Sequence, residues 1–327
     1  MGNTLTAVHK QVSKQVNKEP TKRLTPENSW VKSLSRHRAL YIMLIPGLVY
    51  FLIFKYVPLL GSVIAFQDYK IFKGILGSDW AGLRWFNQIF TYPQFGRLLR
   101  NTLLISLYQI VFAFPAPIII ACLLNELRNM FFKRTVQTIL YLPHFLSWTL
   151  IFGLSYMMFS TQTGIINQII VSLGMEPIQF MQKAEYFRTL IVLSGMWKEM
   201  GWSAIIFLAA LAGISPSLYE AARMDGANRW KQFVHVTLPG LLPAIVILLL
   251  LKIGHVLDLG FEHIYVFLNP ITYETGDILD TYAYRAGIIQ GQYSLTTAIG
   301  LFKSVIGFIL LVTANKISKA ISGEGLY

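Results

Sequence analysis

The chain has 327 residues, of which 54% are hydrophobic and 13% are charged. Charged residues make up about a quarter of an ordinary soluble domain, so this composition excludes such a domain and indicates a membrane protein with several spans. The formal net charge is +12, and the single cysteine, Cys122, lies inside an apolar run, which excludes an intrachain disulfide.

Residues 1–38 form a polar, basic tail rather than a cleavable signal, because the first apolar run begins only near Leu40. Its composition predicts disorder up to Pro26. Six apolar runs follow, each near the length that crosses a bilayer as a helix: 40–64, 101–124, 138–159, 188–213, 238–257 and 295–315. We therefore predict an all-α integral membrane protein, with six transmembrane helices in residues 39–320 and a short C-terminal tail at 321–327.

Prolines and one lysine predict irregular spans. Lys55 and Pro58 indicate that the first span is broken or leaves the lipid near its outer end, with the lysine reaching toward the interface. Pro115 and Pro117 predict a kink in the second span, and Pro143 interrupts the third. Such interruptions are tolerated where neighbouring helices or a water-filled cavity satisfy the freed backbone groups.

The distribution of Lys and Arg predicts the orientation of the spans. With the N-terminus inside, the inner segments 1–39, 125–137, 214–237 and 316–327 carry 8, 3, 3 and 2 of them, whereas the outer segments 65–100, 160–187 and 258–294 carry 5, 1 and 1. We therefore expect both termini in the cytoplasm, with the chain in the plasma membrane. Since the positive charge follows the membrane topology, we expect no nucleic-acid partner.

The connection at 214–237, on the predicted cytoplasmic side, has more pattern than a simple loop needs. Ser215 and Pro216 predict a helix start, with serine as the N-cap and proline at the first helical position. Residues 217–220 also match a capping box. A helix is expected to run to Asp225, followed by a bend at Gly226, since glycine adopts backbone conformations that other residues resist.

The surface of this helix predicts a docking site. Ala221 and Ala222 leave one side nearly bare, which permits a close approach, and charged side chains at its edges can fix the orientation of a partner: Glu220, Arg223 and Asp225. The alternative is an amphipathic helix that lies on the membrane interface. The physical chemistry of these residues leaves the two interpretations open.

Glu220-Ala221-Ala222 is followed at fixed gaps by Gly226, Val236 and Leu238-Pro239. This order resembles the signature of the permease subunits of binding-protein-dependent ABC importers, with valine at position 236 in place of the usual isoleucine. Further segments resemble the polysaccharide and oligosaccharide permeases of Gram-positive bacteria: 45–47, 54–58, 65–69, 82–86, 100–103, 140–145 and 280–285. The resemblance covers nearly the whole chain from residue 40 and leaves the basic tail unassigned.

The resemblance implies a type I ABC importer permease fold, in which the loop at 214–237 carries the coupling helix that inserts into a groove of an ATPase. It implies that the chain is not an enzyme and that ATP and Mg are bound by the ATPase. The implied partners are a second homologous permease, two copies of the cytoplasmic ATPase and an extracellular solute-binding protein or lipoprotein. The implied substrate is an oligosaccharide or polysaccharide fragment. An ion-coupled secondary transporter and a membrane scaffold without a transport role are the alternatives.

Ionisable side chains inside a span are costly, so they are candidates for the substrate path. Lys198 and Glu199 lie in the middle of the fourth run, between Trp197 and Trp202. The functional interpretation is a polar path lined by Glu199, with the two tryptophans stacking on sugar faces. The structural interpretation is pairing with other helices. Only Lys198 and Glu199 are placed deep in a run, which disfavours the ion-coupled transporter.

His255 and Asp258, together with Glu262, follow the fifth run at helical spacing. They predict either the wall of a cavity or a solvated outer rim, and the spacing favours neither. His144, in the third run, is expected to lie at an interface between helices.

Tyr293 opens the last run together with Ser294 and Thr297, and these residues predict either a sugar contact or the cap of that helix. The sequence contains no catalytic constellation and no phosphate-binding glycine loop followed by Lys-Ser/Thr. It also contains no clustered His or Cys ligands that indicate a metal site.

Overall fold

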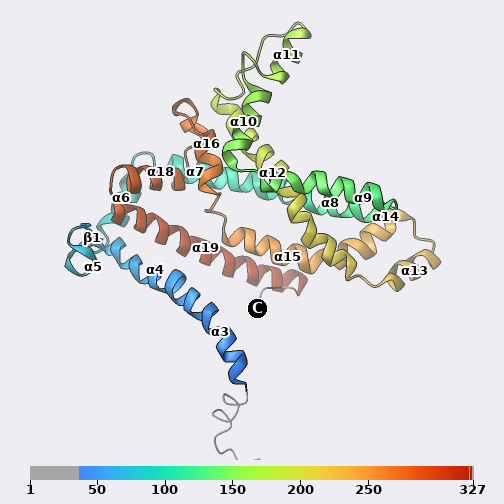
Figure 1. Cartoon of the computed structure of the whole chain (residues 1–327), viewed down its shortest axis with the longest axis horizontal. Coiled ribbons are helices and arrows are strands. Elements are labelled where there is room, and N and C mark those ends of the chain that lie inside the picture. Colours follow the sequence, from blue (N-terminus) through green and yellow to red (C-terminus); the bar gives the residue numbers. More distant parts are fainter. Residues whose placement is uncertain (1–36, 324, 326–327) are drawn as a thin grey trace, which may run out of the picture. The chain divides into compact units, whose positions relative to one another are not determined.

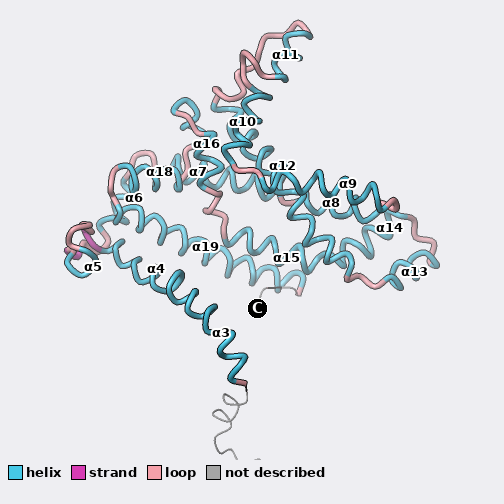
Figure 2. The backbone as a smooth tube through the Cα atoms, viewed as in Figure 1, coloured by secondary structure: helices cyan, strands magenta, loops and turns pink. Residues whose placement is uncertain are grey.

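The computed structural model describes residues 37–323 and residue 325, and most of them are helical (Figures 1 and 2). The chain forms two compact units that meet in sequence between Leu60 and Gly61. Residues 1–36 of the predicted N-terminal tail lie outside the described residues, as do residues 324, 326 and 327 of the predicted C-terminal tail.

The first unit consists of α3 (Arg38–Phe51), the π-helical turn η1 (Leu52–Tyr56) and α4 (Val57–Leu60). The Val57 N–H donates to the carbonyl oxygen of Leu52, so a widened turn lies directly before Pro58, which has no N–H of its own. This is the irregularity that the sequence predicts near Lys55. Every described side chain of this unit is exposed, as expected of a helix whose neighbours are lipid or other chains.

The first half of the second unit carries most of its short elements. Two strands, β1 (Gln67–Asp68) and β2 (Asp79–Trp80), pair antiparallel. The helical elements are η2 (Gly61–Phe66), α5 (Gly74–Gly77), α6 (Arg84–Thr91), α7 (Phe95–Tyr108), η3 (Gln109–Ala113), α8 (Pro115–Glu126), α9 (Met130–Tyr141), η4 (Leu142–Phe145), α10 (Trp148–Phe159) and α11 (Ile165–Ser172).

The second half of this unit begins with a 29-residue helix, α12 (Ala184–Ala212), and ends with a 30-residue helix, α19 (Tyr293–Ser322). The elements between them are α13 (Pro216–Met224), α14 (Arg229–Gln232), η5 (Phe233–Thr237), α15 (Leu238–Gly254), α16 (Phe261–Phe267), η6 (Pro270–Thr272), α17 (Tyr273–Gly276), α18 (Leu279–Tyr284) and η7 (Arg285–Ile289).

Within the described residues, five helical segments are long and apolar enough to cross a membrane: Arg38–Phe66, Phe95–Glu126, Ala184–Ala212, Arg229–Gly254 and Tyr293–Ala320. A sixth span is formed if the pair Met130–Phe145 and Trp148–Phe159 is counted as one, although this pair is bent by 108°. The six segments coincide with the six predicted runs, so the all-helical membrane fold is confirmed. The interruption predicted at Pro143 is present as the bend in the third run.

The bend in the third run has a local cause. Pro143 has no N–H, and it begins a short 3₁₀ turn, η4, after which the chain is extended at Leu146. The Ser147 hydroxyl then accepts a hydrogen bond from the Leu150 N–H at 3.3 Å and caps the new helix α10. Pro115, by contrast, does not break the second span. The π-helical turn η3 precedes this proline, and the helix continues as α8.

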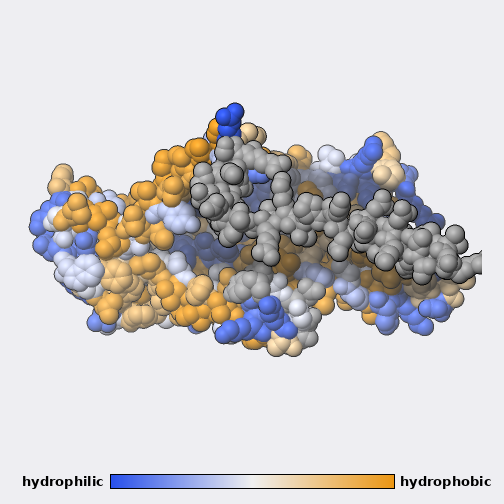
Figure 3. Space-filling model, turned by 90° about the horizontal axis from the view of Figure 1, so that it is seen from below, coloured by the Kyte–Doolittle hydropathy of each residue, from blue (hydrophilic) through white to orange (hydrophobic). Residues whose placement is uncertain are grey.

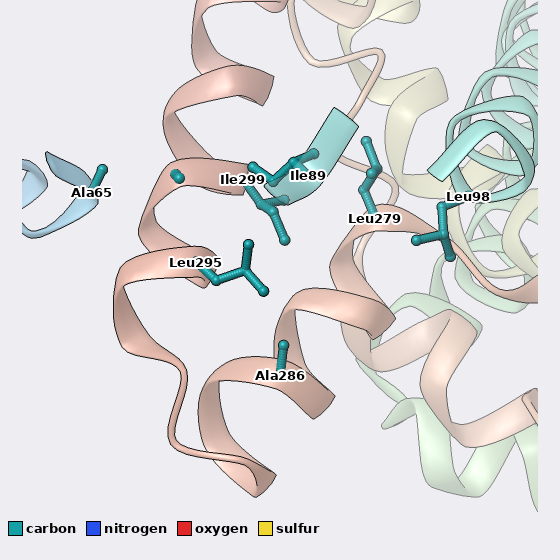
Figure 4. Packing of buried hydrophobic residues seen from close by; sticks show 8 residues of the cluster. Ala65, Ile89, Leu98, Leu279, Ala286, Leu295 and Ile299 are labelled. Atoms are coloured by element: carbon teal, nitrogen blue, oxygen red, sulfur yellow. The ribbon is translucent and has the colours of Figure 1, made fainter. Parts of the chain in front are cut away.

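The core of the second unit is organised around α12, which contacts α8, α15, α9 and α16, while α15 packs along α19. One cluster of buried apolar residues joins α19 to α6, α7 and α18, where Ile89, Leu279 and Ile299 point toward one another (Figure 4). Elsewhere, apolar side chains cover much of the surface visible in Figure 3, as expected for a protein solvated by lipid.

Candidate functional site

The connection between α12 and α15 begins as predicted but is capped differently. Ser215 has the extended backbone of an N-cap, with φ −61° and ψ 128°, and Pro216 is the first residue of α13. Its hydroxyl, however, is hydrogen-bonded to the hydroxyl of Ser217 at 2.7 Å and to no helix N–H. The prediction of a side-chain cap or capping box is therefore wrong, because the two serine hydroxyls satisfy each other.

The predicted bend at Gly226 is confirmed. Gly226 has φ +74°, a left-handed conformation that side chains with a Cβ resist. The Gly226 N–H donates to the Arg223 carbonyl at 3.0 Å, and the Ala227 N–H donates to the Ala222 carbonyl at 2.9 Å. These bonds close α13 in a Schellman-type end. The side chain of Asn228 then caps α14 by accepting from the Lys231 N–H at 2.9 Å.

The residues predicted for docking lie together on α13 and its C-terminal end. Ala222 is half-buried, and the other five are exposed: Glu220, Ala221, Arg223, Asp225 and Gly226. Sequence reasoning missed two apolar neighbours, Leu218 and Met224, of which Met224 is 89% exposed. Their signal was present in the sequence, since both are large apolar residues in an otherwise polar connection. Large exposed apolar side chains are typical of a surface that a partner covers.

The membrane part of the second unit contains a cavity of about 430 Å³. Its walls come mainly from η3, the start of α8, α12 and α15, with contributions from Trp148 and α16. Most of the lining is apolar, and the polar members are Gln109, Glu199, Ser203, Lys252, His255 and His263. A largely apolar cavity with a few polar groups is the usual form of a small-molecule site.

Glu199, predicted to line the substrate path, is at the wall of this cavity. Its Oε2 lies 3.0 Å from His144 Nδ1, and the imidazole of His144 stacks on Trp202 with ring centroids 4.6 Å apart. His144 is therefore the helix-interface residue that the sequence predicts. Trp197 and Trp202 are partly exposed, and neither belongs to the lining of the cavity.

Lys198 is buried and contacts other helical segments, in agreement with the structural interpretation of this residue. Its ammonium donates hydrogen bonds to the carbonyl oxygens of His144 at 2.5 Å and Leu146 at 2.7 Å. It also lies 5.3 Å from the ring centroid of Trp148. These carbonyls belong to the bend between α9 and α10, where helical partners are missing, so Lys198 fastens α12 to that bend.

His263, on α16 between the candidate spans, closes another side of the cavity. Its ring stacks on Trp148 with centroids 3.7 Å apart, and its Nε2 lies 2.9 Å from the Ser194 hydroxyl. Burial, reinforced by the nearby charge of Lys198, lowers the pKa of His263 to about 3. The imidazole is therefore neutral at physiological pH.

Of the three residues predicted after the fifth run, His255 and Asp258 line cavities, whereas Glu262 is exposed and lines neither of them. His255 lines the cavity described above and also a second one of about 470 Å³ between α15 and α19, which Asp258 lines as well. Lys303 of α19 lies 3.8 Å from Asp258 and is hydrogen-bonded to Asp280. Burial raises the pKa of the Asp280 carboxyl, against the opposing effect of Lys303.

Tyr293 lies at the first turn of α19 and lines neither of these cavities. Its ring meets Tyr69 edge-on, with centroids 6.1 Å apart, and the neighbouring Ser294 hydroxyl accepts a hydrogen bond from the Tyr69 N–H at 3.1 Å. This pair of contacts joins the start of α19 to the segment after β1. In the described part of the chain, no three His, Cys, Asp or Glu side chains gather as a metal site would require.

Comparison with known proteins identifies the family. Residues 113–323 match the family described as "binding-protein-dependent transport system inner membrane component". The chain belongs to this family. It is 50% identical to the polygalacturonan/rhamnogalacturonan transport system permease protein YteP of Bacillus subtilis (strain 168) over 90% of this chain and 92% of that protein. It is also 50% identical to protein LplB of the same organism, over 91% of this chain and 94% of that protein.

A solved structure supports the same assignment. A chain of a bacterial alginate ABC transporter, in complex with an alginate pentasaccharide-bound periplasmic protein, matches with a TM-score of 0.82 and 38% identity, over 90% of this chain and 99% of that one. This inner membrane component is thus a permease subunit of an ABC importer with the type I fold, and it is a multi-pass membrane protein with no catalytic role of its own. The secondary-transporter and scaffold alternatives are set aside.

Sequence reasoning missed four polar residues that line the first cavity of this binding-protein-dependent permease: Gln109, Ser203, Lys252 and His263. Lys252 is one helical turn before His255, so the two project from one face of α15. Its signal was the interruption of the apolar run Leu248–Leu251 by a charge close to the end of the fifth run. Gln109 carried no such signal, because its role depends on its contact with Lys252 across 143 positions.

Proposed function

We propose that this permease forms one half of the translocation path for an oligosaccharide or polysaccharide fragment. The other half is a second homologous permease, and an extracellular solute-binding protein delivers the sugar. The observation that carries the proposal is the cavity between η3, α12 and α15, whose apolar walls carry Glu199, Lys252 and His255. Apolar and aromatic groups suit the C–H faces of sugars, and the polar groups suit their hydroxyls.

Relatives support the substrate class. YteP is named for polygalacturonan and rhamnogalacturonan transport, and the alginate transporter is described as importing an acidic polysaccharide. Both permeases match this chain over nearly its whole length. A polysaccharide fragment is therefore the substrate that best fits this chain as well.

The energy source in this proposal is a cytoplasmic ATPase that binds ATP and Mg, with two copies per importer. The exposed surface of α13 docks into one copy of the ATPase, and the small side chain of Ala221 lets the two surfaces come close together. The charged side chains of Glu220, Arg223 and Asp225 fix the orientation of the docked ATPase. Met224 adds apolar contact area. This arrangement requires α13 and both termini on the cytoplasmic side, as the distribution of Lys and Arg predicts.

The mechanical part of the proposal is alternating access. The ATPase pair closes when it binds ATP, and α13 transmits this movement to α12 and α15 through its two ends. ATP shifts the permease toward one state only to the extent that the closed ATPase pair binds that state more tightly. The short α14 and the stacked pair Trp230 and Phe233, with ring centroids 5.5 Å apart, make the link to α15 stiff.

The test is reconstitution of the complete importer in proteoliposomes with the binding protein outside and ATP inside. We expect uptake of labelled oligosaccharide that requires both ATP hydrolysis and the binding protein. An imposed proton or sodium gradient without ATP should give no uptake. Uptake that follows the ion gradient and ignores ATP would overturn the proposal in favour of a secondary transporter.

A further inference from the structure

Lys252 is a cation inside the membrane part of the chain that forms no ion pair among the described residues, although the Glu199 carboxylate on the wall of the same cavity attracts it at longer range. It lies in the last turn of α15 and lines the cavity of about 430 Å³. Its ammonium donates a hydrogen bond to Gln109 Oε1 at 3.0 Å, and no carboxylate of the described residues lies within 4 Å of it. A charged side chain inside a span costs about 2.5–3.5 kcal/mol on insertion scales, so it is expected to serve a function.

The other ionisable groups in this region are satisfied within the chain. Glu199 is paired with His144, Lys198 donates to two carbonyl oxygens, and Lys303 contacts two carboxylates. Each of these three makes a close polar contact with another part of the chain. Lys252 has only a neutral amide oxygen, which uses one of its three hydrogens.

The groups around Lys252 form a corner rich in hydrogen-bond donors. Because Gln109 accepts from Lys252 with its oxygen, its amide NH₂ remains available to donate. His255, one turn further along α15, donates from Nδ1 to the Leu251 carbonyl at 2.9 Å, since a carbonyl can only accept. Its Nε2 is then an acceptor suited to a hydroxyl group.

A fixed ammonium beside an amide NH₂ suits a planar anion with two oxygens. A carboxylate can accept from Lys252 with one oxygen and from Gln109 with the other, and such charge-assisted bonds are about twice as strong as neutral ones. The surrounding walls are apolar, with Leu248, Leu251 and Phe207 among them, so the attraction is less screened than in water. A neutral sugar leaves the ammonium with only the Gln109 oxygen and the more distant Glu199 carboxylate to offset its charge.

We propose that Lys252 and Gln109 form a carboxylate-binding site, and that this site makes the permease selective for oligosaccharides that contain uronic acid residues. The inference rests on the proposed function, since it concerns the sugar that crosses this cavity. Lys252 supplies the charge, Gln109 positions the ammonium and donates to the second oxygen, and His255 accepts from a neighbouring hydroxyl.

The experiment uses the complete importer in proteoliposomes and compares pairs of sugars that differ only in charge. The probes are short oligosaccharides of galacturonate, mannuronate and glucuronate, each with its neutral methyl ester. The central variant is Lys252→Gln, because its amide can still donate to Gln109 Oε1 while the charge is gone. The binding protein is the same throughout, so its own preference cancels when the variant is compared with the wild type.

We expect the wild type to import at least one uronate series faster than its methyl ester. Lys252→Gln should lower uptake of that uronate by about tenfold, the size of one charge-assisted hydrogen bond. Uptake of the ester should change less than twofold, and Lys252→Arg should retain the preference. The matched control, Lys316→Gln, removes the same charge from an exposed position on α19 and should leave both sugars unaffected.

Two results overturn the inference alone: Lys252→Gln transports both sugars as the wild type does, or it lowers both equally. The second result would mean that Lys252 pairs with a carboxylate of the partner permease or only holds helices together. ATP-dependent import of neutral oligosaccharides in preference to all uronates also overturns the inference, while the proposed function stands. Absence of ATP-dependent uptake of any of these sugars by the wild type overturns both.

Discussion

The ammonium of Lys198, in the middle of α12, donates to the carbonyl oxygen of His144 at a distance of 2.5 Å, across 54 positions of sequence. The same ammonium reaches the Leu146 carbonyl at 2.7 Å. Both carbonyls lie where the chain turns by 108° between η4 and α10, and both have lost the helical N–H that would otherwise bind them. A buried cation is therefore part of what makes this bend stable in an apolar surrounding.

Lys198→Met should destabilise the permease without changing its choice of sugar. The substitution leaves two partly buried carbonyl oxygens unpaired, and each such group costs up to about 1–3 kcal/mol. We expect a lower melting temperature of the purified importer, measured by following unfolding in detergent. Lys252→Gln serves as the comparison, because it should keep the melting temperature while altering sugar selectivity. An unchanged melting temperature for Lys198→Met, combined with altered selectivity, would contradict this assignment.

Gly201→Ala should disrupt the packing of α12 against α9. A Cβ built on Gly201 would lie 2.0 Å from the Leu140 carbonyl oxygen, and backbone cannot move aside as a flexible side chain can. We expect a loss of several-fold in the yield of assembled complex, measured by co-purification with the partner permease. Gly153→Ala is the matched control, since it is helical and exposed and its Cβ would meet no atom within 4 Å. Equal yields from the two variants would contradict the close approach.

The sequence predicted what depends on neighbours along the chain and missed what depends on distant contacts. The apolar runs, the helix at 216–224 and the bend at Gly226 follow from local residue types, and all three are present. The acceptors of Lys198 could not be predicted, because they are created only when Pro143 bends the third run toward α12. The same limit applied to Gln109 and Lys252, which meet across two separate spans.

His263 should make the stability of the permease fall as the pH is lowered. Its pKa is about 3 in the folded chain, whereas an unfolded histidine titrates near 6.5, so below that value only the unfolded state takes up the proton. The contribution of His263 to the stability of the folded chain is fully present above about pH 6.5 and is lost as the pH falls toward 3. By linkage the loss from this group at pH 5 is about 2 kcal/mol.

The measurement for His263 is the melting temperature of the wild type and of His263→Gln between pH 7.5 and pH 5. Glutamine can still donate to the Ser194 hydroxyl but has no proton to gain, so the variant should lose less stability over this range, even if it is less stable at pH 7.5 because its contact with Trp148 is gone. His235→Gln is the control, since His235 is exposed. Parallel pH curves for the wild type and His263→Gln would show that the folded state accepts the proton.

Gly226 provides the sharpest test of the coupling role of α13, because two substitutions there have opposite expectations. Proline fixes φ near −65°, which is incompatible with the +74° of Gly226, so Gly226→Pro should displace the end of α13. Asparagine tolerates the left-handed region and should be accepted. We expect Gly226→Pro to lower ATP-driven uptake by at least tenfold and to release the ATPase during purification, whereas Gly226→Asn keeps both within about twofold of the wild type.

Glu220→Lys extends this test from the backbone to the charged edge of α13. Glu220 is exposed, so reversing its charge should leave the fold and the melting temperature unchanged while weakening a docked ATPase. The decisive readouts are co-purification of the ATPase and its stimulation by the loaded binding protein. If Glu220→Lys and Gly226→Pro both keep the ATPase bound and sugar uptake at the wild-type rate, α13 is not the surface through which ATP hydrolysis drives transport, and the amphipathic interfacial helix becomes the better interpretation.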